Sequence, residues 1–141
     1  MLEAAVEGAC EASRSDPPRV VAVTVLTSLD GPALDELGLN RPPHDIVLAW
    51  ARLARECALA GVVASAQEAA AVRQVCGGGF LIVTPGIRPA TSERDDQRRV
   101  LTPAEAIRAG ADILVVGRPV TRAHDSAAAA RSIVEEIAST I

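Results

Sequence analysis

Four short apolar runs recur along the chain and predict the strands of a single sheet. They occupy 20–26 (VVAVTVL), 61–65 (GVVAS), 80–84 (FLIVT) and 113–117 (ILVVG). β-Branched residues are frequent in them and apolar and polar positions do not alternate, which is typical of parallel strands buried on both faces. We therefore expect four parallel strands covered by helices.

Segments with helical character separate these runs. In 44–59 the apolar residues recur at i, i+3 and i+4, which predicts an amphipathic helix. Its inward face would comprise Ile46, Val47, Trp50, Leu53, Ala54 and Cys57, with Arg52, Arg55 and Glu56 turned outward. Further helices are predicted over 2–12, over 66–76, from the cap Thr102 to Gly110, and over 126–140, where Ile133, Val134 and Ile137 would face inward.

The order of these elements limits the fold. Regular alternation of strand and helix with short links predicts right-handed crossovers and a parallel α/β architecture. Two architectures fit: an open doubly wound sheet, or half of a (β/α)8 barrel, which needs eight strands and about 250 residues. No G-x-G-x-x-G follows a strand, so the simplest sign of a dinucleotide fold is missing.

Composition and charge narrow the function. The 141 residues, 49% hydrophobic and 23% charged, suit one globular domain over 1–141. The 14 basic and 18 acidic residues, net charge -4, give no electrostatic footprint for nucleic acid or an anionic membrane. Neither a signal peptide nor an apolar stretch of about 20 residues is recognisable, so we expect a soluble, cytoplasmic protein.

Cysteine usage gives no sign of cross-links or metal. Cys10, Cys57 and Cys76 are far apart and form no C-x-x-C pair. This pattern predicts neither a disulfide framework nor a zinc site, and we interpret the cysteines as buried free thiols in a reducing compartment.

Two arginines follow the ends of adjacent predicted strands. The third strand leads into Thr84-Pro85-Gly86-Ile87-Arg88-Pro89, and the fourth into Gly117-Arg118-Pro119. Ligands bind at the carboxyl ends of parallel strands, glycine admits a phosphate close to the backbone, and guanidinium pairs with it bidentately. The spacing alone leaves open that Arg88 and Arg118 are solvated loop charges.

Beyond these patterns, the chain resembles the orotidine 5'-phosphate decarboxylase family. From about Val20 to the C-terminus it carries, in family order and spacing, VTVLTSLD, GVVASAQEA, VTPGIRP, DDQRRVLTPAEAIRAGAD and ILVVGRPVT. The resemblance implies the C-terminal half of a (β/α)8 TIM barrel, with these strands as the fifth to eighth. It further implies release of carbon dioxide from orotidine monophosphate to give UMP, without metal or organic cofactor, and usually as a homodimer.

The resemblance assigns ligand contacts residue by residue. Arg88 and Gly117-Arg118 match the family's phosphate ligands, and Gln97 matches the glutamine that bridges phosphate and pyrimidine. Thr27 matches a nucleotide-contacting position, and the hydroxyl of Ser28 beside it is also suited to read a base edge. For Thr27 and Ser28 a cap or turn role stays open, as does a solvated loop role for Gln97.

The catalytic lysine of the family has no counterpart here. All 14 basic residues are Arg and the sequence contains no Lys, whereas the family protonates the departing carbon with a Lys in an Asp-x-Lys-x-x-Asp cluster on its third strand. Arg is too firmly protonated to replace it. We interpret the remaining candidate acids and bases as solvated or capping residues: Asp30, His44, Asp95, Asp96 and His124.

Three hypotheses remain. The first is a truncated or split decarboxylase chain that needs an N-terminal half-barrel to supply the Lys. The second is a noncatalytic, self-associating half-barrel that binds phosphate or nucleotide. The third, another phosphosugar enzyme of the same barrel group, is disfavoured by the DQRR and TPGIRP strings. Met1 lies in what should be the helix before the fifth strand, so we expect a break near the midpoint of a barrel.

Overall fold

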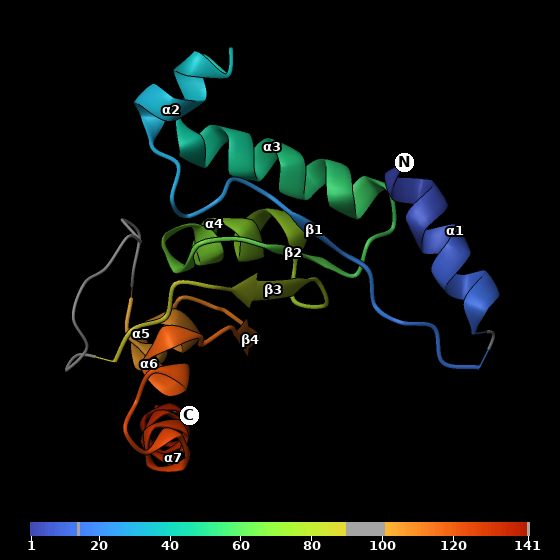
Figure 1. Ribbon diagram of the computed structural model, residues 1–141. Helices are drawn as coiled ribbons and strands as arrows, with labels where there is room; N and C mark the ends of the chain where they lie inside the picture. The colour runs from blue at the N-terminus through green and yellow to red at the C-terminus, as the bar shows by residue number, and fades with distance from the viewer. Residues whose placement is uncertain (14, 90–100, 141) are drawn as a thin grey trace.

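The chain forms one parallel sheet. The computed structural model describes residues 1–13, 15–89 and 101–140 (Figure 1). Its strands are β1 (Val21–Val23), β2 (Gly61–Val63), β3 (Leu81–Thr84) and β4 (Ile113–Leu114), hydrogen-bonded in the order β1-β2-β3-β4. All pairs are parallel, and one row of the register joins Val23, Val63, Val83 and Ile113. The four predicted strands are confirmed, although each is shorter than the apolar run that predicted it.

Helices alternate with the strands. They are α1 (Leu2–Ala12), α2 (Gly31–Glu36), α3 (Pro43–Glu56), α4 (Ala66–Cys76), α5 (Pro103–Arg108), α6 (Arg118–Thr121) and α7 (Ser126–Ala138). The helix predictions over 2–12 and 66–76 are confirmed. Two short helices, α2 and α6, were not predicted, because they lie in segments that read as strand-end loops.

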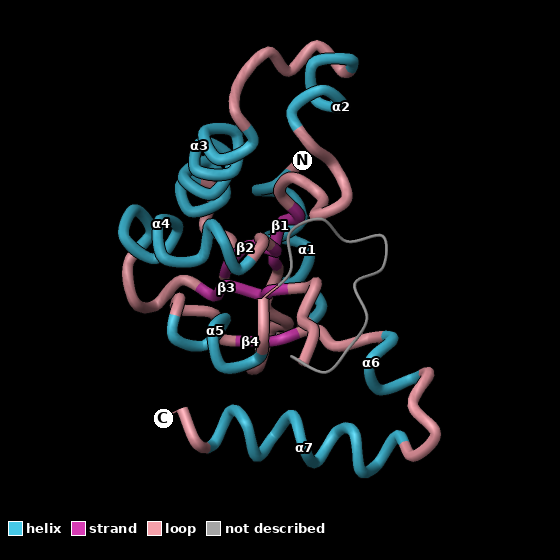
Figure 2. Tube along the Cα trace, turned by 90° about the vertical axis from the view of Figure 1, so that its left-hand side faces the viewer, coloured by secondary structure: helices cyan, strands magenta, loops and turns pink. Residues whose placement is uncertain are grey.

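The main core lies between the sheet and two helices. Figure 2 shows α3 and α4 on one side of the strands. Seven core side chains there have no exposed surface: Val47, Ala51, Ala54, Val62, Ala69, Val72 and Ile82. A smaller cluster of Ala66, Ile87, Ala106 and Ala111 continues the core beneath α5. Apolar burial therefore fixes α3 and α4 on β1 to β3.

The other face of the sheet is open. Val23 is 59% exposed and Ile113 47% exposed, and Leu26 and Val115 are about as accessible. Our prediction of strands buried on both faces is wrong for the described residues. The physical reason is that α3 and α4 cover only one face, so the apolar side chains that alternate to the opposite face have no packing partner.

Several side chains also differ from the predicted pattern. Trp50, Leu53 and Val134 are exposed, contrary to prediction. In α3 the buried stripe runs through Ile46, Val47, Ala51 and Ala54, so the large side chains at 50 and 53 lie beside it. Of the three thiols, only that of Cys76 is buried, and burial raises its pKa. The prediction of buried thiols is therefore wrong for Cys10 and Cys57.

The predicted start of α5 is confirmed in detail. Thr102 is the N-cap: its hydroxyl accepts from the Glu105 N–H at 3.2 Å, and Glu105 Oε2 accepts from the Thr102 N–H at 2.8 Å. These bonds form a reciprocal capping box. Hydrogen bonds to the charged carboxylate lower the pKa of Glu105; the bond from the Thr102 N–H has the larger effect and the bond from the Thr102 hydroxyl the smaller.

Candidate functional site

The candidate ligand residues follow the carboxyl ends of three strands. Thr27 and Ser28 come after β1, Arg88 comes after β3, and Gly117 and Arg118 come after β4. Because parallel strands end at the same edge of the sheet, these residues share one edge of the molecule. The remaining candidate, Gln97, lies outside the described residues.

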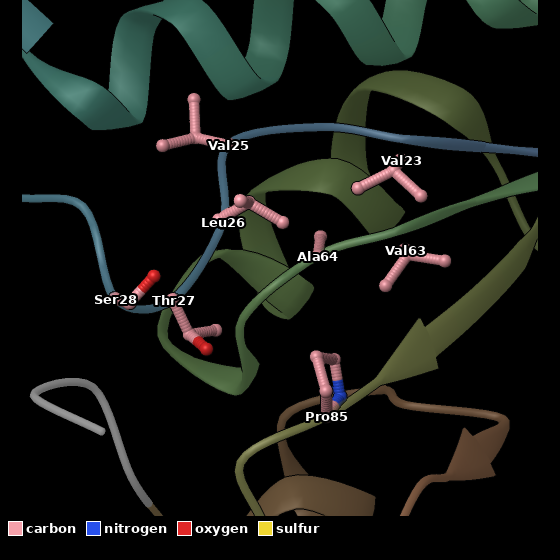
Figure 3. A pocket seen from close by; sticks show the side chains of 8 residues that line it. All are labelled: Val23, Val25, Leu26, Thr27, Ser28, Val63, Ala64 and Pro85. Carbon is pink, nitrogen blue, oxygen red and sulfur yellow. The ribbon is translucent and has the colours of Figure 1, made fainter. Parts of the chain in front are cut away.

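A cavity of about 390 Å³ opens at this edge (Figure 3). It is lined by Val23, Val25, Leu26, Thr27, Ser28, Val63, Ala64 and Pro85. Six of the eight lining side chains are apolar, and the other two, Thr27 and Ser28, carry hydroxyl groups. Such a mixture of apolar surface and a few polar groups suits a small organic ligand.

The two hydroxyl residues lie on the loop after β1. Thr27 is 8% exposed, whereas Ser28 is exposed. Figure 3 shows Val25 directed toward α3, away from the loop that carries Thr27 and Ser28. The cap of the next helix is Asp30, whose Oδ1 accepts from the Ala33 N–H at 3.2 Å. Neither Thr27 nor Ser28 is therefore the cap of α2, which removes one of the two roles left open by the sequence.

Arg88 is a buried cation. It is 8% exposed, and within the described residues its side chain makes one hydrogen bond, from Nη1 to the Ile87 carbonyl at 3.4 Å. Its main-chain N–H donates to the Leu101 carbonyl at 3.1 Å, beside a parallel bridge between Ile87 and Leu101. A guanidinium has five donors, and the contacts within the described residues use one of them. It is not a solvated loop charge.

Gly117 and Arg118 form the start of α6. Gly117 is the N-cap and Arg118 the first helical residue, followed by Pro119. The Val120 and Thr121 N–H groups donate to the Gly117 carbonyl at 2.9 and 3.0 Å. Among the described residues, no atom lies within 4 Å of the position that a Cβ would take on Gly117, so these residues leave space for a ligand beside this glycine. Arg118 is half-buried.

The structure brings only part of the candidate set into one cavity. Thr27 and Ser28 line it, whereas Arg88, Gly117 and Arg118 do not. Sequence reasoning missed Val63 and Pro85 as lining residues; the signal was available, because each lies at or just after the end of a strand. The described residues hold no cluster of His, Cys, Asp or Glu that could bind a metal ion.

Among residues 1–13, 15–89 and 101–140, none of the helices is both long enough and apolar enough to cross a membrane.

Comparison with known sequences gives a consistent set of relatives. Residues 1–133 match the family model described as Orotidine 5'-phosphate decarboxylase / HUMPS family. The chain is 56% identical over 135 residues to the orotidine 5'-phosphate decarboxylase of Moorella thermoacetica, covering 95% of this chain and 54% of that protein. It is 50% identical over 127 residues to that of Trichlorobacter lovleyi, covering 90% and 53%. The chain thus spans about half the length of the curated relatives it matches.

Solved structures agree. The orotidine 5'-phosphate decarboxylase of Lactobacillus acidophilus superposes with a TM-score of 0.82 at 34% identity, covering 97% of this chain and 58% of that one. An uncharacterized conserved protein from Geobacillus kaustophilus gives a TM-score of 0.79 at 38% identity, with the same coverage. The predicted fold, four parallel strands of a half-barrel, is confirmed.

Proposed function

The chain belongs to the orotidine 5'-phosphate decarboxylase / HUMPS family, and from this premise we propose that it is the phosphate- and nucleotide-binding half of a decarboxylase barrel. The reaction would convert orotidine monophosphate to UMP and carbon dioxide, a step of pyrimidine biosynthesis. The observation that carries the proposal is the juxtaposition, at one sheet edge, of a hydroxyl-bearing cavity and two arginines that follow neighbouring strands.

The residues divide by chemistry. Arg88 and Arg118 bind the phosphate dianion, each with a planar set of donors, and the open space at Gly117 lets the phosphate approach the backbone. Thr27 and Ser28 contact the nucleoside part in the cavity, where hydroxyls can both donate and accept. On the family resemblance, Gln97 bridges the two parts of the ligand.

These residues bind but cannot complete the reaction. Loss of carbon dioxide leaves a carbanion-like carbon that must receive a proton, and a group placed beside that carbon must supply it. The sequence contains no Lys, and an arginine holds its proton too firmly to serve. The proton donor and its neighbouring carboxylates therefore come from another four strands, supplied by a further segment or a second chain.

A second candidate function is favoured by the open face of the sheet. The apolar residues Val23, Leu26, Ile113 and Val115 are each about half exposed. Val23 and Ile113 lie in one row of the register, and β1 and β4 are edge strands of the described sheet. Exposed apolar surface and unpaired strand edges promote association. A self-associating half-barrel that binds phosphate or nucleotide without catalysis would satisfy both features.

The decisive experiment measures turnover with and without the missing half. The purified chain is assayed for loss of orotidine monophosphate, alone and mixed with the N-terminal half of the Moorella thermoacetica relative. The proposal expects no turnover alone and measurable turnover in the mixture. As a control, the N-terminal half alone must be inactive. A mixture that forms a stable complex without turnover would favour the noncatalytic function, and turnover by the chain alone would contradict the requirement for an outside proton donor.

A further inference from the structure

β4 is weakly supported by apolar packing. It comprises Ile113–Leu114, and neither residue is buried. Within the described sheet it pairs with β3 alone, and Ile113 and Val115 are exposed on its open side. Register is weakly specified when a one-residue slip changes little burial. Leu114 and Val116 pack against the smaller core cluster only as half-buried side chains, which leaves a part for polar contacts in aligning β4 with β3.

Arg73 of α4 forms hydrogen bonds with two chain segments near the amino end of β4. Its Nη1 donates to the carbonyls of Gly77 at 2.8 Å and Phe80 at 2.6 Å, before β3. Its Nη2 donates to the Gly110 carbonyl at 3.0 Å and to Asp112 Oδ2 at 2.6 Å, before β4. One guanidinium thus joins the turns that lead into both strands. The turn before β4 depends on Gly110, whose φ of 99° is in the left-handed region that favours glycine.

Asp112 completes the link to β3. Its Oδ2 accepts from the Ile82 N–H at 2.7 Å, and its own N–H donates to the Ile82 carbonyl at 3.0 Å. Both main-chain groups of Ile82, a residue with no exposed surface, are therefore paired with Asp112. A slip of β4 by one residue would break both bonds and the ion pair with Arg73.

This alignment extends to the ligand end of the strand. Beyond β4, the Val115 N–H donates to the Thr84 carbonyl at 2.9 Å, and Gly117 and Arg118 follow. A one-residue slip would carry them about 3.3 Å along the strand, far more than the roughly 0.5 Å that a binding site tolerates. We propose that Arg73 and Asp112 are positioning residues that set the register of β4 and thereby place Gly117 and Arg118; this inference rests on the proposed function, which assigns those two residues to phosphate.

The test compares Asp112→Ala with a matched control, Arg55→Ala. Arg55 also donates from Nη1 to a main-chain carbonyl, that of Val75 at 3.0 Å, but Val75 belongs to α4 and to neither turn that Arg73 joins. Two quantities are measured in the purified chain: the Kd for UMP by calorimetry, and the NMR amide shifts of residues 115–118. For Asp112→Ala we expect a Kd raised about three- to tenfold and displaced amide shifts. For Arg55→Ala we expect neither.

Asp112→Asn separates positioning from a general loss of stability. Its amide oxygen can still accept from the Ile82 N–H but lacks the charge that pairs with Arg73, so an intermediate effect is expected. It also replaces Asp112→Ala if that variant does not fold. Unchanged UMP affinity and unchanged amide shifts in a folded Asp112 variant would overturn the inference. If the wild-type chain does not bind UMP, the proposed function fails, and the amide shifts alone still decide whether Asp112 sets the register.

Discussion

Two regions of the sheet are stabilised by different interactions: β1 to β3, which form its apolar half, and β4 with the helices that follow it, which form its second half. β1 to β3 pack against α3 and α4 through side chains with no exposed surface, among them Val47, Val62 and Ile82. In the region of β4, α6 has no buried residue and α7 has one, Ile133. Polar contacts supplement the small cluster beneath α5 there: the Arg73–Asp112 ion pair, and the Glu136 carboxylate that accepts from the Ala104 N–H at 3.1 Å.

The difference matters because the candidate site belongs to both halves. Thr27 and Ser28 follow β1 and Arg88 follows β3, both in the apolar half, whereas Gly117 and Arg118 follow β4, which polar contacts help to align. Contacts made by Thr27, Ser28 and Arg88 should therefore respond to mutations in the core, and contacts made by Gly117 and Arg118 to loss of charge and capping groups.

The largest effect on the free energy of unfolding is expected from the core beneath β1 to β3, the apolar half of the sheet. Ile82→Ala removes a side chain with no exposed surface and should lower the free energy of unfolding by about 2–5 kcal/mol, because it leaves a cavity. Ile113→Ala, on the open side of β4, serves as the control and should cost less than about 1 kcal/mol. Urea unfolding followed by circular dichroism measures both. Equal costs would show that the two halves are packed alike.

An intermediate effect is expected from the capping box of α5. Thr102→Ala should lower the free energy of unfolding by about 1 kcal/mol. Folding depresses the pKa of Glu105 below its ordinary value of 4.5, so the stability that this carboxylate contributes is present above pH 4.5 and is lost as the pH falls through its folded pKa. The difference between wild type and variant should therefore shrink on acidification. A difference independent of pH would show that the charge of Glu105 does not contribute.

The smallest effect on stability is expected on the open face. Val115→Ser should change the free energy of unfolding of the monomer by less than about 0.5 kcal/mol, because Val115 has little packing to lose. It should nevertheless reduce self-association, measured by light scattering during size-exclusion chromatography. Val134→Ser, exposed on α7, is the matched control. The same loss of association in both variants would place the association surface elsewhere than the open sheet face.

Local signals in the sequence predicted the elements well and the coverage of the sheet poorly. Helix α4 and the Thr102 cap depend on neighbouring residues, which the sequence displays. An apolar run such as 113–117 predicts a strand but does not show which elements pack on each of its faces. The open face of the sheet could therefore not be recognised from the sequence. The short helix α6 was missed because Gly117-Arg118-Pro119 reads as a ligand loop, although a proline near a helix start is itself a helix signal.

The candidate site was predictable to a similar extent. Strand-end position and the resemblance indicated Arg88, Gly117 and Arg118, the resemblance indicated Thr27, and its own hydroxyl group indicated Ser28; strand order places all five at one edge. The burial of Arg88 and the walls that Val63 and Pro85 contribute to the cavity depend on tertiary packing. The Arg73–Asp112 pair joins residues far apart in the chain, and no local motif indicates it.

The central claim is that Arg88, Gly117 and Arg118 form a phosphate-binding site. Calorimetry with UMP and uridine tests this claim most directly. UMP should bind at least about tenfold more tightly than uridine, and Arg118→Ala should weaken UMP binding by about 1.5–3 kcal/mol, the range for hydrogen bonds to charged groups. Uridine binding should not change in that variant. Equal affinities for UMP and uridine, or an unchanged UMP affinity in Arg118→Ala, would contradict the claim.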